Sequence, residues 1–445
     1  MSKSQPKIIV LDDDPTGSQT VHSCLLLMQW DVETLKIGLR DKVPIFFVLT
    51  NTRAIAPEKA RSIAQQVCRN LKQALAEEQI TNFLVVSRSD STLRGHYPIE
   101  TDAIAEELGD FDAHFLTPAF FEGGRVTKDS VHYLLIDGTL TPVHETEFAQ
   151  DSVFGYSYSY LPDYVAEKTQ GKITADRVVT LQLSDLRSND LPAKLLDLNN
   201  NQCVAVDGET QADFDLLAQA ILDTSSQGKR FLFRSAASLL TSLAQLGEQP
   251  IAPDSMATYK PTNKPGIVLV GSHVSKTTRQ LKQLLQESAT TGIEVNVVRL
   301  RDNPQQRDSI LQETLDSVLT AWQQGQTPVV YTSREELSFA NIQQRLDFGV
   351  EVSNLLMDVV KGLPAEIGFL ISKGGITSND VLSNGLQLNT ARLLGQIIPG
   401  VSVVKTAEDH HQFPNLPVVL FPGNVGSDRG LVDAWSRLTI FLANR

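Results

Sequence analysis

The stretch KIIVLDDDPTGSQT, Lys7–Thr20, decides the fold class of the amino-terminal half. Its apolar part predicts a strand over Lys7–Leu11 that opens directly into three aspartates, followed by Pro15, Thr16 and Gly17. Ligands of an open α/β sheet bind at the carboxyl ends of its strands, so acids there are placed to hold a metal, orient a hydroxyl or accept a proton. The alternative is that the aspartates cap the next helix.

A second polar cluster, SRSDSTLRG at Ser87–Gly95, follows another predicted strand at Phe83–Val86. The carboxyl ends of parallel strands meet at one edge of a sheet, so residues that follow two such strands come together. Both clusters carry acids and hydroxyls, and the second adds two arginines. Together they indicate a single site, which favours the functional interpretation of the aspartates over capping.

Length and composition limit the number of domains and the classes of protein to which this chain can belong. The chain has 445 residues, more than one hydrophobic core usually serves, and its apolar share of 41% is enough to fill two domains. The formal net charge of −13 argues against nucleic-acid binding, which requires a basic face. Cys24, Cys68 and Cys203 lie far apart without CxxC spacing, so they predict neither a disulfide framework nor a cysteine zinc site.

No apolar run approaches the roughly 20 residues that span a bilayer. The amino terminus, MSKSQPK, leads only into a short strand. We therefore expect a soluble, cytoplasmic protein that binds neither membrane nor nucleic acid. The sequence leaves the oligomeric state open, with a homodimer among the alternatives.

A proline-rich joint divides the chain. Four prolines and several small polar residues between Gln249 and Gly266 suit an extended linker better than a helix or strand. We expect one domain over residues 1–248, a linker over 249–265 and a second domain over 266–445. On each side of the joint strand-like and helical segments alternate, which predicts an α/β fold of two domains, each with a largely parallel sheet flanked by helices.

Short apolar runs mark the strands, and apolar residues at three- and four-residue spacing mark the helices. The predicted strands are Lys7–Leu11, Ile45–Leu49, Phe83–Val86, His114–Leu116 and Phe231–Phe233 in the first half, and Ile267–Val270, Val295–Val298, Val329–Tyr331, Phe369–Ile371, Val401–Val404 and Val418–Phe421 in the second. The clearest helices are Ala56–Leu75 and Asp308–Trp322.

Four strands of the second half end in small, polar or glycine-rich turns, at Gly271–Ser275, Thr332–Arg334, Lys373–Ser378 and Pro422–Gly426. Glycine lets the backbone approach a bulky anion, and a following helix offers free N–H groups, so the four turns together indicate a phosphate site. Lys373 either meets a phosphate as a point charge or faces solvent. No GxxxxGK[ST] occurs and no GxGxxG follows the first strand of either half, which leaves a nucleotide held by strand-end loops.

These motifs resemble those of the four-carbon acid sugar kinase family. The resemblance rests on Asp-Asp-x-Thr-Gly, Ser-Arg-Ser-Asp-Ser-Thr-x-Arg-Gly, Lys-Gly-Gly-Ile-Thr-Ser and Phe-Pro-Gly-Asn-Val-Gly, and it spans nearly the whole chain. It implies an ATP-dependent kinase that phosphorylates the terminal hydroxyl of a tetronate such as erythronate, threonate or an oxo-tetronate. It also implies that the amino domain holds the sugar acid and the carboxyl domain holds ATP.

The resemblance also implies site residues. The implied catalytic residues are Asp13 and Asp14, and the implied substrate contacts are Arg88, Ser89, Asp90, Ser91, Thr92, Arg94 and Gly95. The implied nucleotide contacts are Ser272, Gly374, Gly375, Ile376, Thr377, Gly423 and Asn424. Many members carry an acidic residue where this chain has Ile376, so an acidic contact is lost or moved to Asp380, and many carry an aromatic residue where it has Pro15.

Phosphoryl transfer needs reactants in line, stabilisation of charge and a base near the attacking hydroxyl. Asp14 or Asp13 is the candidate base, because crowding among carboxylates raises the pKa of a carboxyl group. Asp13 is also the candidate ligand for Mg²⁺. A tetronate carboxylate suits planar bidentate donors. The candidates to hold it are Arg53, Arg88, Arg94 and Arg125.

Two functions of other classes stay open. One is a reductase or isomerase of sugar acids that binds a dinucleotide, although the missing GxGxxG counts against it. The other is a non-catalytic sensor of a sugar acid or nucleotide. The acids at both strand ends count against a sensor, because a sensor needs no base.

Overall fold

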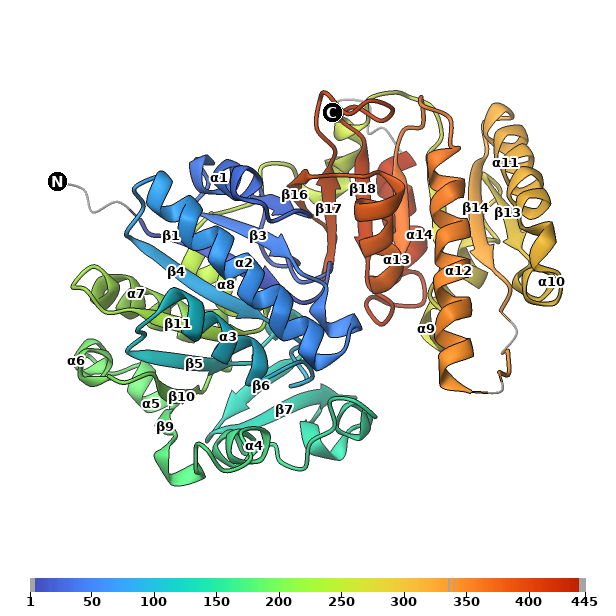
Figure 1. Ribbon diagram of the computed structural model, residues 1–445. Helices are drawn as coiled ribbons and strands as arrows, with labels where there is room; N and C mark the ends of the chain where they lie inside the picture. Colours follow the sequence, from blue (N-terminus) through green and yellow to red (C-terminus); the bar gives the residue numbers. More distant parts are fainter. Residues whose placement is uncertain (1–4, 335–336, 340, 440–445) are drawn as a thin grey trace. The chain divides into compact units, whose positions relative to one another are not determined.

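The computed structural model describes residues 5–334, 337–339 and 341–439 of the chain (Figure 1). The stretch MSKS at the amino terminus, and with it the first residues of the predicted first domain, lies outside the described residues, as do 440–445 at the end of the predicted second domain. The chain forms two compact units, Met1–Glu248 and Gln249–Arg445. Each unit is an α/β structure with a mostly parallel sheet flanked by helices, which confirms the predicted fold class.

The sheet of the first unit is parallel throughout. Its strand order is β2 (Leu25–Leu27), β3 (Ile45–Leu49), β1 (Lys7–Asp12), β4 (Phe83–Arg88), β11 (Phe231–Ser235), β5 (Ala113–Thr117), β10 (Gln202–Val206) and β9 (Val179–Leu181). β1 lies between β3 and β4, so the order of the strands reverses beside it. Such a reversal opens a crevice at the carboxyl ends of the strands, where ligands of this fold bind.

Helices cover both faces of this sheet. On one face α1 (Val32–Arg40), α2 (Pro57–Glu77) and α3 (Ile99–Leu108) bury their apolar residues against β1, β3 and β4. The remaining longer helices are α4 (Leu161–Lys168), α7 (Gln211–Ser225) and α8 (Ala237–Ala244), and Figure 1 shows α8 behind the sheet. A separate antiparallel sheet of β6 (Arg125–Lys128), β7 (Val131–Ile136) and β8 (Thr139–Pro142) was not predicted from the sequence.

The second unit has a mixed sheet. Its strand order is β13 (Thr290–Val295), β14 (Thr327–Thr332), β12 (Ile267–Val270), β15 (Leu370–Lys373), β18 (Pro417–Phe421), β17 (Val401–Lys405) and β16 (Thr390–Ile398). The first five strands are parallel, whereas β17 runs antiparallel to both of its neighbours. The first strand of this unit, β12, lies between β14 and β15, so the strand order reverses here as well.

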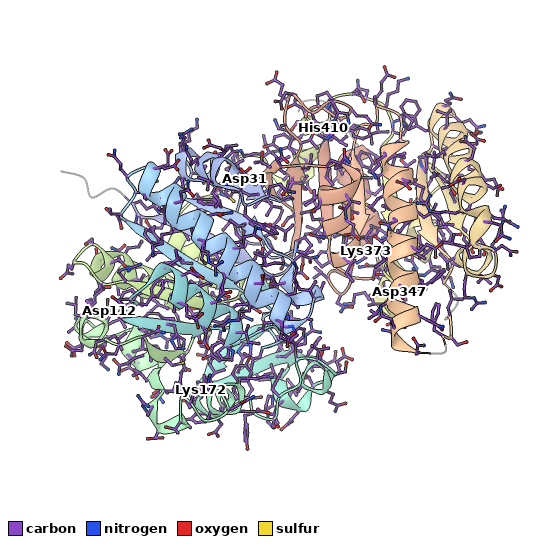
Figure 2. All side chains as sticks on the ribbon, viewed as in Figure 1. Asp31, Asp112, Lys172, Asp347, Lys373 and His410 are labelled. Carbon is purple, nitrogen blue, oxygen red and sulfur yellow. The ribbon has the colours of Figure 1, made fainter. Side chains whose placement is uncertain are left out.

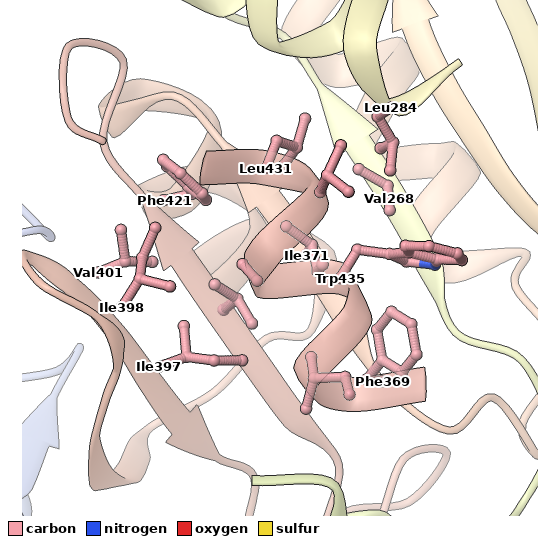
Figure 3. Packing of buried hydrophobic residues seen from close by; sticks show 14 of the residues in the cluster. Val268, Leu284, Phe369, Ile371, Ile397, Ile398, Val401, Phe421, Leu431 and Trp435 are labelled. Atoms are coloured by element: carbon pink, nitrogen blue, oxygen red, sulfur yellow. The ribbon is translucent and has the colours of Figure 1, made fainter. Parts of the chain in front are cut away.

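The core of the second unit lies between the sheet and two helices, α9 (Ser275–Leu284) and α14 (Gly430–Thr439) (Figure 3). Leu431 and Trp435 of α14 pack over Ile371 and Phe421 of the sheet, while Leu284 of α9 lies close to Val268. The indole Nε1 of Trp435 donates to Thr327 Oγ1 at 3.1 Å, so the polar atom of this buried ring is satisfied. The other long helices of this unit are α11 (Arg307–Gln323) and α12 (Ile342–Lys361).

Two local expectations differ from the structure. The strand predicted at Val295–Val298 ends at Val295, and the helix α10 (Val297–Asp302) starts there, because the side chain of Asn296 accepts from the Arg299 amide at 2.8 Å and caps that helix. The linker predicted at 249–265 is not extended throughout. It contains the 3-10 helix Pro253–Tyr259, and its Met256 is fully buried in the core of the second unit.

Two further observations concern the chain as a whole. Among the described residues, no helix combines the length and the apolar character that a bilayer crossing demands. Cys24, Cys68 and Cys203 are buried and form no disulfide bond in the described part of the chain.

Candidate active site

Strand register brings the two polar clusters of the first unit together. Asp12 on β1 is paired with Arg88 on β4, and Arg88 is paired with Ser235 on β11. The amide of Asp13 donates to the carbonyl of Arg88 at 3.3 Å, so the loop after β1 continues alongside β4. The site that forms here lies where the strand order reverses, as expected for this fold.

Asp13 lies in the centre of a buried hydrogen-bond network. Arg53 grips it from one side, with Nη2 at 2.5 Å from Oδ1 and Nε at 3.2 Å from Oδ2. From the other side Ser89 Oγ donates to Asp13 Oδ2 at 2.8 Å. Both carboxylate oxygens are therefore occupied, and the side chain is held in one orientation.

Arg234 and Glu100 extend this network, and neither was predicted from the sequence as a site residue. Arg234 donates to Ser89 Oγ at 2.6 Å through Nη2, and to Glu100 Oε2 at 2.7 Å through Nη1. Both side chains are buried. A signal for Arg234 was present, since it follows the apolar run FLF near a strand end, whereas Glu100 lies in the first turn of α3 and carries no such signal.

Gly95 shows how closely this network is packed. Its φ is +128°, and a Cβ at this position would lie 2.4 Å from Ser89 Oγ and 2.5 Å from Arg234 Nη2. Only glycine combines this backbone conformation with that approach. Gly95 thus belongs to the site by the space it leaves, not by any contact of its own.

Asp14 differs from its two neighbours in being accessible. Its side chain is 22% exposed, whereas that of Asp13 is 2% exposed. Oδ1 accepts from the amide of Thr16 at 2.8 Å and from its hydroxyl, and Oδ2 faces Arg53 Nη1 at 3.4 Å. Burial raises the pKa of Asp14, but Arg53, Arg88 and the Thr16 hydrogen bonds outweigh it, so the pKa is lowered. The prediction that the pKa of this carboxyl group is raised is therefore wrong.

The carboxyl group with a raised pKa is that of Asp12. Burial raises it to about 7, Arg88 opposes the shift, and Asp13 and Asp14 add to it. Asp12 Oδ1 accepts from Arg88 Nη1 at 3.4 Å, while Oδ2 is buried without a hydrogen-bond partner among the described residues. A Cβ at Gly17 would lie 2.1 Å from both oxygens, so the glycine makes room for this carboxyl group.

We expect Asp12→Asn to stabilise the protein at alkaline pH. The pKa of Asp12 is about 7 in the fold against 3.8 ordinarily, so from pH 4 to 7 the unfolded chain loses a proton that the folded chain keeps. Wild-type stability therefore falls as the pH rises through this window, and the variant escapes that loss. Urea unfolding should show the difference between variant and wild type growing by about 3 kcal/mol from pH 4.5 to pH 8. The exposed Asp110→Asn is the control, and a constant difference for Asp12→Asn would contradict this account.

Of the four arginines predicted to hold a carboxylate, three already have one. Arg88 contacts Asp12, Arg53 grips Asp13, and Arg94 Nε donates to Asp90 Oδ2 at 2.7 Å. Arg94 also lies 3.6 Å from a carboxylate oxygen of Asp151 and over the ring of Phe148. Burial raises the pKa of Asp90, but Arg53, Arg94 and a hydrogen bond from Thr92 together hold it well below its usual range.

Arg125 is the exception. It donates to the Gly123 carbonyl at 2.6 Å through Nη1, its Nε is buried without a hydrogen-bond partner, and it forms no ion pair with a described residue. Burial lowers its pKa, and it lies close enough to Asp90 and Arg94 for their charges to act on it. An unpaired, half-buried guanidinium beside the site is the group best placed to receive an anionic ligand.

The cavity in this part of the site is very small. Its volume is about 10 Å3, and it lies among the loop after β4 and the ends of β5 and β11. A cavity of this size holds one water molecule. The lining residues are Ser89, Asp90, Leu93, Arg94, Leu116, Pro118, Tyr164, Arg234, Ser235 and Ala236. A ligand larger than a water molecule therefore fits here only after side chains such as the partly exposed Arg94 move.

The contacts of Asp13 do not suit the Mg²⁺ ligand predicted from the sequence. Its oxygens accept from Arg53 and Ser89, and a cation would have to displace the guanidinium. No group of three or more histidine, cysteine, aspartate or glutamate side chains in the described part of the chain is arranged to hold a metal ion. We therefore assign no protein-held metal to this site.

In the second unit the glycine-rich turns meet at one edge of the sheet. Lys373, at the end of β15, is paired with Val270 on β12 and with Phe421 on β18, so the loops that follow these strands are neighbours. The side chain of Lys373, labelled in Figure 2, is fully buried. Its Nζ donates to the carbonyls of Pro422 and Gly423 and lies 4.1 Å from the centre of the Phe421 ring.

Positive charge gathers at this edge without acidic partners among the described residues. Burial lowers the pKa of Lys373 to about 7, Lys276 adds to the shift, and no acid opposes it. Arg334 follows β14, donates to Thr278 Oγ1 at 2.7 Å, and keeps Nε and Nη1 buried without hydrogen-bond partners in the described part of the chain. Buried cations without acidic partners are costly unless an anion compensates them.

The predicted nucleotide contacts surround Lys373. Thr277 Oγ1 donates to Ser272 Oγ at 3.2 Å and to the Gly423 carbonyl at 3.1 Å, which ties the first loop to the last. Gly374 has a φ of +125°, and a Cβ there would lie 3.0 Å from Ser272 Cβ, so a larger residue would strain the turn. The other predicted contacts are Gly375, partly exposed at the start of α13 (Gly375–Asp380), Thr377, buried within it, Ile376, 66% exposed, and Asn424, also exposed.

The acidic contact that family members place at the position of Ile376 was expected to be lost or moved to Asp380. The carboxylate of Asp380 accepts from the Ser353 hydroxyl and from the side-chain amide of Asn379. Its carboxylate is thus hydrogen-bonded to residues of α12 and α13. The exposed apolar side chain of Ile376 leaves this turn without a negative charge, which suits a site for a polyanion.

Comparison with known proteins identifies the family of this chain. Residues 8–243 match a family described as the sugar-binding N-terminal domain, and residues 267–431 match a family described as the nucleotide-binding C-terminal domain. The class of protein is thereby defined as one that joins a sugar-binding to a nucleotide-binding domain. The chain belongs to the four-carbon acid sugar kinase family.

Individual relatives agree with this placement. The chain is 26% identical over 446 residues to a 3-oxo-tetronate kinase of Pectobacterium atrosepticum, covering 95% of this chain and 97% of the relative. It is 25% identical over 330 residues to a D-erythronate kinase of Heliobacterium modesticaldum, covering 69% and 68%. A Salmonella typhimurium LT2 protein of known structure, described as a candidate tRNA synthase, shares the fold with a TM-score of 0.71 at 19% identity, covering 96% of this chain and 98% of that one.

Proposed function

We propose that this protein is an ATP-dependent kinase that phosphorylates the terminal hydroxyl of a four-carbon sugar acid of the erythronate, threonate or oxo-tetronate type. The observation that carries the proposal is the division of charge between the two units. The first unit holds a hydrogen-bonded set of carboxylates at the crevice of its sheet, and the second holds buried cationic groups for which the described part of the chain supplies no acidic partner. A hydroxyl donor suits the first site and a polyphosphate suits the second.

In the first unit Asp14 is the group that accepts the hydroxyl proton. It is the accessible one of the three aspartates, and its Oδ1 is fixed by Thr16. Its Oδ2 accepts only a long hydrogen bond, from Arg53 at 3.4 Å, and has a second lone pair for a substrate hydroxyl. Its lowered pKa keeps it ionised at neutral pH, so it is always ready to accept a hydrogen bond. Arg125 takes the carboxylate of the sugar acid, and the Arg53 and Ser89 contacts keep Asp13 beside it.

In the second unit Lys373 and the turns around it hold the phosphates. The Lys373 ammonium neutralises phosphate charge, and the backbone of Gly374 and Gly375 lets the chain approach the anion closely. Mg²⁺ enters with ATP, since in such sites the ion is held largely by the phosphates themselves and stabilises their developing charge.

A direct test is ADP release in the presence of Mg²⁺ and ATP, with D-erythronate, threonate and oxo-tetronates as acceptors. Turnover of at least one acid, with the phosphate found on its terminal hydroxyl, is the expected result. ATP binding without turnover of any four-carbon acid would instead support a sensor. Fluorescence of a bound reduced dinucleotide would support a reductase, for which the chain lacks GxGxxG.

Arg125→Lys should raise the KM for the sugar acid at least tenfold and leave the KM for ATP within twofold. The lysine keeps the charge but loses the planar fork that matches a carboxylate, and tenfold corresponds to about 1.4 kcal/mol. Steady-state kinetics with each substrate varied in turn checks the expectation. Arg69→Lys, which alters an exposed arginine paired with Glu107, is the matched control. An equal rise in both KM values for Arg125→Lys would show that this arginine does not grip the acid.

A further inference from the structure

Three successive carbonyls of the predicted substrate loop, Ser89–Gly95, each receive a hydrogen bond from a side chain far along the chain. His132 Nε2 lies 2.7 Å from the carbonyl oxygen of Ser91, the hydroxyl of Tyr156 donates to the carbonyl of Thr92 at 2.7 Å, and the hydroxyl of Tyr164 donates to the carbonyl of Leu93 at 2.8 Å. We infer that His132, Tyr156 and Tyr164, called the clamp below, are positioning residues that hold this loop in the conformation that binds the sugar acid. This inference rests on the proposed function.

All three side chains are held as hydrogen-bond donors. His132 is fully buried, and its Nδ1 lies 2.9 Å from Thr127 Oγ1, so Nε2 carries the proton that the Ser91 carbonyl accepts. Burial lowers the pKa of His132 to about 4, which keeps the ring neutral. Burial also raises the pKa of both tyrosine hydroxyls, so they stay protonated at any physiological pH.

The three contacts determine what the loop presents to a ligand. The C=O and N–H of a trans peptide point in opposite directions, so turning the carbonyls of Ser91 and Leu93 toward the clamp turns the amides of Thr92 and Arg94 away from it. No described residue accepts from these two amides. Leu93 has a φ of +65°, an uncommon conformation for this residue, and the hydrogen bond at its carbonyl helps to maintain it.

The same loop carries the ion pair that borders the cavity. Asp90 and Arg94 flank the clamped carbonyls, and Arg94 Nε reaches Asp90 Oδ2 at 2.7 Å. If the carbonyls lost their donors, the backbone between these two residues could rotate. The ion pair would then no longer be held in a fixed position relative to Ser89 and Arg234. The antiparallel sheet, which supplies His132 on β7, and the helix α4, which supplies Tyr164, thereby act on the substrate site through the backbone of this loop.

A neighbouring tyrosine separates positioning from plain packing. Tyr97 stacks on Tyr164 with ring centres 6.0 Å apart and is just as buried, but its hydroxyl faces His114 and Cys203 instead of the loop. Tyr97→Phe therefore removes one hydroxyl from the same aromatic cluster and leaves the loop carbonyls satisfied. It is the matched control for Tyr156→Phe and Tyr164→Phe.

The test combines kinetics with hydrogen exchange. The double variant Tyr156→Phe/Tyr164→Phe should raise the KM for D-erythronate, or for whichever tetronate the wild type turns over, at least tenfold while the KM for ATP stays within twofold. Amide exchange of the peptide 89–96 should become at least fivefold faster. Tyr97→Phe should change neither quantity. Equal effects of Tyr97→Phe, or a double variant with unchanged KM for the acid, would overturn the inference.

The outcomes also separate this inference from the proposed function. If the wild type phosphorylates no tetronate, the proposed kinase activity fails on its own. Amide exchange then decides the clamp without any substrate: faster exchange confined to the double variant supports it, and exchange that does not distinguish the double variant from Tyr97→Phe overturns it.

Discussion

Lys373→Met is expected to weaken ATP binding at least tenfold and to lower kcat/KM at least a hundredfold, which is about 2.7 kcal/mol of transition-state stabilisation. Lys373 is fully buried at the meeting point of the glycine-rich turns, and its ammonium contacts two carbonyl oxygens and the Phe421 ring. A phosphate is the partner that its ammonium lacks. The folded protein should lose no stability, because methionine replaces a buried, unpaired cation with an apolar chain of similar length.

The pKa of Lys373 adds a second readout to this prediction. In the free protein burial lowers the pKa to about 7, and a bound phosphate raises it again. ATP binding above pH 7 must therefore take up a proton, and its affinity should fall as the pH rises from 7 toward 9. Calorimetry in buffers of different ionisation enthalpy measures the uptake. Lys282→Met, an exposed position on α9, is the control, and proton uptake that persists in Lys373→Met would contradict the assignment.

Asp14→Asn is expected to lower kcat at least a hundredfold while both KM values change little. Asparagine has the same shape and can still accept from Thr16, but it cannot take the proton of the attacking hydroxyl. The measurement is steady-state turnover with ATP and the best tetronate.

Asp31→Asn provides a closely matched control for this substitution. Asp31 also accepts from the amide and hydroxyl of a threonine, Thr34, and its pKa is lowered by those hydrogen bonds, but it caps α1 outside the site. Similar losses of kcat in the two variants would show that Asp14 is a structural cap. That was the alternative interpretation of the aspartates in the sequence.

Much of the architecture could be predicted because it depends on local patterns. The strand at Ile45–Leu49 and the helix near Ala56–Leu75 follow from apolar runs and helical spacing, and the structure has β3 and α2 there. The clustering of the loops after β1 and β4 follows from parallel pairing alone, since it requires only that the strands be neighbours in one sheet. Asn296, by contrast, ended a predicted strand through a capping hydrogen bond that short apolar periodicity does not reveal.

The ionic state of the site could not be predicted in this way. Crowding of three aspartates suggested a raised pKa for Asp14, but Arg53 approaches from a different segment and reverses the shift. The raised pKa belongs to Asp12, which is fully enclosed and accepts long hydrogen bonds from Arg88 at 3.4 Å and from the Asp14 amide at 3.3 Å. Burial and opposite charge act against each other, and their balance depends on distances that no local pattern encodes.

The sequence by itself determined which residues stand at the ends of the strands, because alternation of strand and helix places polar turns at one edge of a parallel sheet. Only the tertiary structure decided which of these residues are already paired. Among the described residues it gave carboxylate partners to Arg53, Arg88 and Arg94 but none to Arg125, and it enclosed Lys373 without an acid. The physical reason is that the two properties depend on different neighbours. Strand position depends on residues nearby in the sequence, whereas ion pairing and desolvation depend on residues nearby in space.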